Sequence, residues 1–114
     1  MASAAREIRM LPETCRTLAF GGIVAGYTVV GTPLEHPARI MLIQNLTDET
    51  VMFSLDGVHD HFPLSLNGHL IVDITANKTT TSGFFLAEGD RLYVKRIGVP
   101  TAGAVYFTTF YGKD

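Results

Sequence analysis

The densest cluster of side chains that could do chemistry in this sequence is the tripeptide His59-Asp60-His61. Imidazole and carboxylate groups are good ligands for divalent transition metals, so a metal-dependent enzyme is one hypothesis. The two histidines lie two residues apart and share a face only if the segment is extended. His36 and His69 would reach them only through folding that the sequence does not dictate. We interpret the tripeptide as part of a solvated turn and expect no metal ligands here.

A second candidate is Cys15, which could act as a nucleophile. No histidine is near it in the sequence, and Arg16 is its only basic neighbour, so little would favour the thiolate form. We interpret Cys15 as a structural thiol. With the tripeptide read as a turn, the sequence predicts no catalytic residues, no cofactor-binding residues and no enzyme activity.

Two further patterns concern turns. Four carboxylates could bind calcium through a loop, but their spacing fits no EF-hand, and we interpret them as solvated turn residues; they are Asp48, Glu49, Asp56 and Asp60. The segments Asn45-Leu46-Thr47 and Asn77-Lys78-Thr79 match the glycosylation acceptor pattern. Residues 1–9 carry no long apolar core, so we interpret them as something other than a secretory signal, and both acceptor patterns as chance.

Composition bounds the class of protein. The 114 residues predict one domain, with 46% hydrophobic and only 18% charged residues. The formal net charge is −2 and no basic stripe is present, which argues against nucleic-acid binding. A single cysteine excludes an intrachain disulfide and fits synthesis in a reducing cytoplasm. No apolar stretch approaches the roughly 18 residues of a membrane span.

The elements that must position any site are short apolar runs closed by turn residues. Such runs, separated by Asn, Asp, Gly and Pro, predict an all-β fold, namely a single antiparallel β-sandwich or jelly-roll-like barrel of about seven to nine strands. The predicted strands are residues 16–20, 23–30, 39–44, 51–55, 61–64, 69–74, 83–86, 91–96 and 104–111. Residues 1–14 are expected to form a short N-terminal arm, and residues 15–114 the β-sandwich domain.

Three of these strands carry positional information. Residues 39–44 are apolar on both faces from Ile40 to Ile43, which predicts a central strand. Pro63 confines residues 61–64 to an edge or to a strand start. The run 104–111 places Val105, Phe107 and Tyr111 on one face and Tyr106 and Phe110 on the other. A strand that is apolar on both faces is central between layers or meets a partner.

The order of sequence motifs resembles that of small β-sandwich structural proteins of tailed bacteriophages. The motifs are Thr17-Leu18-Ala19-Phe20-Gly21, Tyr27-Thr28-Val29-Val30-Gly31-Thr32-Pro33-Leu34, Pro37-Ala38-Arg39-Ile40, Asn45-Leu46-Thr47-Asp48, Ser54-Leu55-Asp56-Gly57, Asp73-Ile74-Thr75-Ala76-Asn77-Lys78 and Leu92-Tyr93-Val94-Lys95. They span nearly the whole domain but not the arm. They are strand and turn signatures and include no chemical site.

The resemblance implies a non-enzymatic virion protein that acts by binding other virion subunits. We expect a capsid cement or decoration subunit that binds the major capsid protein and its own copies as a homo-oligomer. The alternatives are a head–tail connector, a neck or tail/fibre component, and a receptor- or glycan-binding module. The expected location is the virion, after synthesis in the host cytoplasm, with neither nucleic acid nor membrane as a partner.

Overall fold

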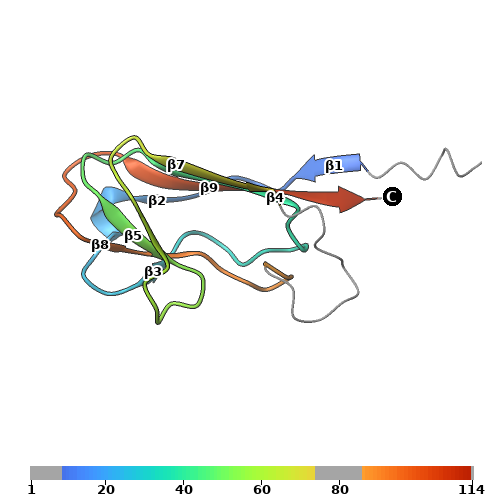
Figure 1. The fold of residues 1–114 in the computed structure, drawn as a ribbon, viewed down its shortest axis with the longest axis horizontal. Helices are drawn as coiled ribbons and strands as arrows, with labels where there is room; N and C mark the ends of the chain where they lie inside the picture. Colours follow the sequence, from blue (N-terminus) through green and yellow to red (C-terminus); the bar gives the residue numbers. More distant parts are fainter. Residues whose placement is uncertain (1–8, 74–85, 114) are drawn as a thin grey trace, which may run out of the picture.

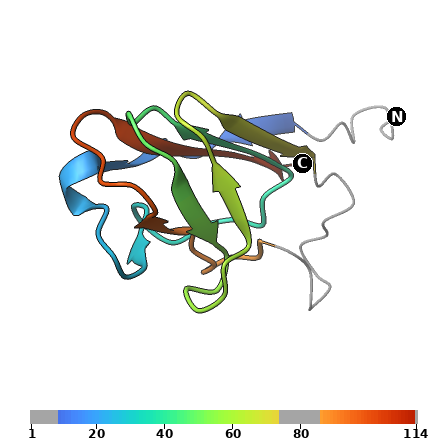
Figure 2. The same ribbon diagram turned by 60° about the vertical axis from the view of Figure 1, so that its left-hand side comes forward.

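A computed structural model, which describes residues 9–73 and 86–113, shows two antiparallel β-sheets packed face to face (Figures 1 and 2). The predicted all-β sandwich is confirmed. The strands are β1 (Arg9–Pro12), β2 (Arg16–Ala19), β3 (Thr28–Val29), β4 (Ile40–Asn45), β5 (Val51–Ser54), β6 (Phe62–Leu64), β7 (His69–Asp73), β8 (Tyr93–Arg96) and β9 (Ala104–Lys113). A single 3₁₀ turn, η1 (Phe20–Gly22), follows β2.

The strand order divides the chain into two layers. Sheet A has the order β1-β9-β4-β7, and β2 also pairs with β9. Sheet B has the order β3-β8-β5-β6. None of the described segments forms a helix with the length and apolar character needed to cross a bilayer.

The core lies between the two sheets because strands of both layers alternate buried and outward residues. In β4, Met41, Ile43 and Asn45 are buried while their neighbours are not. In β9, Val105, Phe107 and Thr109 point inward in the same way. The apolar core consists of Ile23, Val30, Leu34, Ala38, Met41, Ile43, Val51, Phe53, Leu86, Leu92, Val94, Val105 and Phe107. The predicted central position of β4, between β9 and β7, is confirmed.

Three other strand predictions have different outcomes. Pro63 lies in β6, an edge strand of sheet B, as its missing N–H requires. The predicted strand 23–30 is mostly wrong, because only β3 is extended and paired. The reason is that this run carries the chain from sheet A to sheet B, so Ile23 packs into the core and closes η1 through its amide. Of the predicted strand 83–86, only Leu86 lies within the described residues.

Strands β1 and β2 pair with consecutive parts of β9 but in different registers. Pro12 pairs with Phe110, whereas Arg16 pairs with Phe107, so residues 13–15 stand opposite residues 108–109. Three residues against two is the count of a β-bulge, which changes the phase of the strand. Residues 9–12, which belong to the predicted arm, thus pair within their own chain.

The loop ends of the sandwich depend on glycine at one close approach. Gly103 has φ +88°, and a Cβ there would lie against the carbonyl of Leu46, well inside van der Waals contact. Gly89 has a similar φ of +91°, but a Cβ there would meet nothing within 4 Å. Both substitutions to alanine incur left-handed backbone strain of about 1–2 kcal/mol.

We therefore expect Gly103→Ala to lower the free energy of unfolding by at least about 2 kcal/mol more than Gly89→Ala, because only the first forces two backbone segments apart. Urea denaturation of the two variants and the unaltered chain measures this difference. Equal losses at the two positions would show that the loop at Gly103 moves away at little cost.

Candidate interaction surface

One candidate surface is the face of sheet A that points away from sheet B. Because Met41 and Ile43 are buried, the alternating residues Ile40 and Leu42 of β4 point outward. Cross-strand pairing places Phe110 of β9 beside Ile40 and the β7 residue Ile71 beside Leu42.

Five large apolar side chains gather on this outer face, and we call them the outer stripe. They are Ile40, Leu42, Ile71, Tyr106 and Phe110. Ile71 is 61% exposed, whereas the other four are half-buried. The predicted two-sided apolar character of β9 is confirmed, since Val105 and Phe107 fill the core while the two aromatic residues of the stripe face outward. An apolar sheet face of this kind is typical of an interface.

Polar groups frame the outer stripe. Gln44 of β4 and His69 of β7 lie side by side on the same face at one end of the stripe. Asp73 lies at the other end of β7. Cys15, which is exposed, lies at the β2 side, where Thr108 donates a hydrogen bond to its Sγ atom (3.4 Å). An apolar centre with a polar rim is the usual anatomy of a protein–protein contact.

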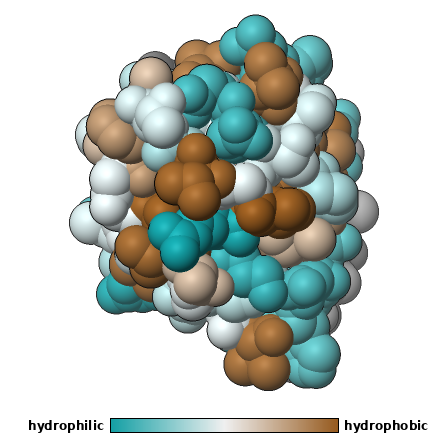
Figure 3. Space-filling model, turned by 90° about the vertical axis from the view of Figure 1, so that its left-hand side faces the viewer, coloured by the Kyte–Doolittle hydropathy of each residue, from teal (hydrophilic) through white to brown (hydrophobic). Residues whose placement is uncertain are grey.

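A second group of apolar side chains lies on loops at one end of the sandwich. In the described parts of the chain, this loop end holds six of the nine exposed large hydrophobic residues: Phe20, Val24, Leu46, Leu66, Ile97 and Val99. Backbone hydrogen bonds hold these loops together, including those from Phe20 to Gly103 (3.0 Å) and from Leu46 to Ala104 (2.9 Å). Figure 3 faces this end and shows apolar side chains interrupted by polar ones.

The loop that follows β4 at this end of the sandwich is held by the buried side-chain amide of Asn45. The Asn45 side chain is fully buried and donates to the carbonyls of Glu49 (2.8 Å) and Leu64 (2.9 Å), while its oxygen accepts from Thr47. A nitrogen occupied and buried in this way cannot accept a glycan. Asn45 is therefore structural, and Asn77 lies outside the described residues.

The tripeptide His59-Asp60-His61 does not act as one unit. Asp60 accepts hydrogen bonds from the Tyr27 hydroxyl (2.5 Å) and from Lys95 Nζ (2.9 Å). His59 instead contacts Asp56 through its ring (2.7 Å). Burial and then the Asp60 carboxylate raise the pKa of Tyr27 above its ordinary value.

The ring of His61 accepts a hydrogen bond from the Leu55 amide through Nδ1 (2.9 Å), and its Nε2 lies 3.9 Å from the Asp56 oxygen that His59 also contacts. The backbone amide of His59, followed by its ring and the Val58 amide, holds the pKa of Asp56 below its ordinary value. Asp48, the first of the four turn carboxylates, accepts from the amide and hydroxyl of Thr101. Within residues 9–73 and 86–113, no group of three or more His, Cys, Asp or Glu side chains could hold a metal ion.

A buried ion pair that the sequence did not reveal lies inside the opposite end of the sandwich. Arg16 Nη2 contacts Glu13 Oε1 at 2.5 Å, and their side chains are 4% and 2% exposed. The guanidinium also donates to the carbonyls of Thr32 (2.7 Å) and Pro33 (3.0 Å) and to the Thr109 hydroxyl (3.3 Å). Such complete pairing is what a buried charge requires.

The other oxygen of Glu13 has its own partner. His36 Nδ1 lies 2.8 Å from Glu13 Oε2, and its ring stacks on Tyr111 with centroids 3.7 Å apart. Burial alone raises the pKa of Glu13, but hydrogen bonds from Arg16, His36 and the Glu35 amide outweigh it and lower this pKa. Both carboxylate oxygens are occupied, so Glu13 is a structural anion and not a general base.

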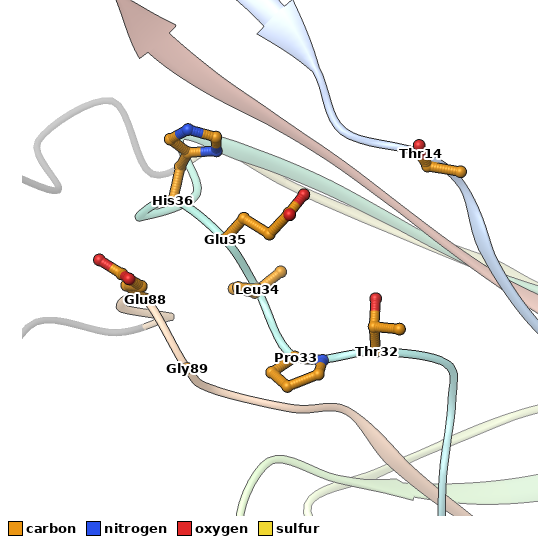
Figure 4. A pocket seen from close by; sticks show the side chains of 8 residues that line it. All are labelled: Thr14, Thr32, Pro33, Leu34, Glu35, His36, Glu88 and Gly89. Carbon is orange, nitrogen blue, oxygen red and sulfur yellow. The ribbon is translucent and has the colours of Figure 1, made fainter.

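An open pocket of about 840 Å³ lies beside this ion pair, between the loop at residues 32–36 and the turn at Glu88-Gly89 (Figure 4). Its lining is Thr14, Thr32, Pro33, Leu34, Glu35, His36, Glu88 and Gly89. Glu35 and Glu88 come from opposite walls, and neither is paired with a nucleophile or an acid–base partner in the described structure. The described lining therefore combines two carboxylates with His36, whose ring is held by Glu13.

Comparisons of the chain with protein-family models, with curated proteins and with solved structures found no match. Any assignment of function therefore depends on the surfaces and contacts described above and on the motif resemblance. Of these, the outer stripe is an apolar feature on a regular sheet face, and the loop end holds more of the exposed apolar side chains.

The Glu13–Arg16 pair gives stability a defined pH dependence. Because the pKa of Glu13 is lowered in the folded state, its contribution is complete above the ordinary carboxyl pKa and is lost as pH falls through the folded value. We expect Glu13→Gln to reduce the free energy of unfolding at pH 7 by about 3–5 kcal/mol, since Arg16 stays buried without its counter-ion.

The measurement is chemical denaturation between pH 7 and pH 3. The difference between the unaltered chain and Glu13→Gln should shrink below about pH 4. The matched control is Glu88→Gln, an exposed change near the same pocket, which should shift the curve by less than about 0.5 kcal/mol. A constant difference across the pH range would contradict the assigned role of Glu13.

Proposed function

We propose that this chain is a non-enzymatic structural protein of a bacteriophage virion, a capsid cement or decoration subunit that binds the major capsid protein and its own copies. The observation that carries the proposal is the outer stripe, an apolar centre on a flat sheet face with a polar rim. The resemblance of the strand and turn motifs to tailed-phage structural proteins supports the same assignment.

The partners of the candidate reactive groups also support a structural role. Asp60 is bound by Tyr27 and Lys95, and Glu13 is bound by Arg16 and His36. Cys15 contacts a threonine hydroxyl on the outer face. These groups hold loops and strands in place, which is the role expected of polar residues in an assembly subunit.

A decoration subunit needs more than one contact surface, because it meets both the shell and neighbouring subunits. The outer stripe and the loop end are two separate apolar regions, one on a sheet face and the other on loops. Repeated contacts in a symmetric shell multiply the effect of individually weak ones.

The test is binding of the purified chain to phage particles encoded by the same genome, followed by localisation on the particle. We expect stoichiometric binding to heads, and Ile71→Asp to weaken it at least tenfold because a charge replaces an exposed residue of the outer stripe. Val58→Asp is the matched control, since Val58 is 73% exposed on the β5–β6 loop.

Binding to tails and not to heads would replace the decoration role with a neck, tail or fibre role. Binding to neither would overturn the virion proposal. Equal effects of Ile71→Asp and Val58→Asp would show that the outer stripe is not the contact surface.

A further inference from the structure

We propose that the outer face of sheet A docks on the same face of a second copy of this chain, with the strands of the two copies antiparallel. This names one partner for the surface already described, and it rests on the proposed function in treating that surface as an interface. The contact is isologous, so one two-fold axis lies between the two sheets and runs perpendicular to the strands.

The cross-strand register defines three rows on this face, each crossing β9, β4 and β7 in that order. The first row is Phe110, Ile40 and Asp73; the middle row is Thr108, Leu42 and Ile71; the last row is Tyr106, Gln44 and His69. The middle row is mostly apolar, and each flanking row has an aromatic residue at β9 and a polar, ionisable residue at β7.

A two-fold axis along the middle row makes the face complementary to itself. It exchanges the first and last rows, so Phe110 of one copy faces Tyr106 of the other twice. Leu42 and Ile71 each face their own equivalents at the centre. Aromatic pairs and aliphatic contacts then fill the middle of the interface, where contact energy concentrates.

The ionisable residues of β7 favour this axis over one that runs parallel to the strands. The same rotation places Asp73 opposite His69 of the second copy, an acid facing a base at both ends. An axis parallel to the strands would instead carry the β7 residues over β1 and β2, where they would meet Pro12 and Thr17. Only the perpendicular axis pairs unlike ionisable groups.

The size of the face sets the strength of the contact. Four strand positions at about 4.8 Å and the six residues of β4 at about 3.4 Å give a flat footprint of about 400 Å² per copy. A standard interface buries about 800 Å² per partner. We therefore expect a reversible dimer that forms at micromolar or higher concentration and strengthens when copies are arrayed.

The chain's single cysteine is a built-in reporter of this arrangement. Cys15 lies beside Thr108, which places it in line with the middle row and therefore close to the two-fold axis. The backbones of packed sheets are about 10 Å apart, so two thiols that point toward each other lie within that distance. A bis-maleimide with a spacer of about 8–10 Å spans it.

The experiment treats the full native chain with this bis-maleimide over a range of concentrations and measures the yield of covalent dimer. We expect yield to rise with concentration, and Ile71→Asp to lower it about tenfold while Val58→Asp leaves it unchanged. Circular dichroism of each variant confirms that the sheets are intact.

A charge exchange tests the register itself. His69→Asp places acid against Asp73 of the second copy and should lower the yield about fivefold or more, whereas adding Asp73→His should restore it. A double variant as weak as the single one, or self-association without Cys15 cross-linking, would overturn this arrangement. If the cross-linked dimer forms but does not bind phage particles, only the proposed function is wrong. If the chain binds particles but does not form the dimer, only this inference is wrong.

Discussion

The pairing of the buried Arg16 guanidinium is the interaction on which the rest of this domain depends. A charge that is 4% exposed must have its donors satisfied, and here they reach one carboxylate, two loop carbonyls and one hydroxyl on β9. These contacts join the β1–β2 link, the loop at residues 31–35 and strand β9 of sheet A. The loop approaches so closely that a Cβ on Gly31 would lie 2.6 Å from Arg16 Cβ, and the φ of Gly31 is +71°. Charge burial, backbone geometry and glycine thus depend on one another at this site.

The β-bulge between β1 and β2 connects this buried charge to the outer face. In an uninterrupted strand, Glu13 and Arg16 would point to opposite sides, because residues three apart have opposite phase. The extra residue allows both side chains to point inward and turns Cys15 outward beside Thr108. Without the bulge the guanidinium would stand on the outer face next to the apolar stripe. The same local insertion therefore stabilises the interior and keeps the β2 side of the surface uncharged.

How far the sequence predicts this structure depends on whether the determinants are local. The alternation in β4 and β9 is local, and so is the edge position imposed by Pro63, and these predictions are confirmed. The bulge is not local, because it is defined by the register against a strand about ninety residues away. The burial of Arg16 is not local either, since only Glu13 is close to it in the sequence and its other partners come from two distant segments. The sequence predicts the β9 part of the outer stripe, because Tyr106 and Phe110 alternate with the core residues. Which residues of β4 and β7 join them depends on the strand order, which the sequence does not specify.

The two faces of β9 have different roles, and the contacts that they make differ in strength. The inner face packs Val105 and Phe107 permanently, so its contribution is measured by the folding equilibrium. The proposed outer contact of about 400 Å² per copy is too small to be permanent, so concentration would govern it. Weak contacts suit a shell, because a misplaced subunit can dissociate before its neighbours lock it in place, whereas a complete set of contacts adds up to a stable assembly. A larger apolar face would bind more tightly in a pair but would favour off-pathway association of free subunits.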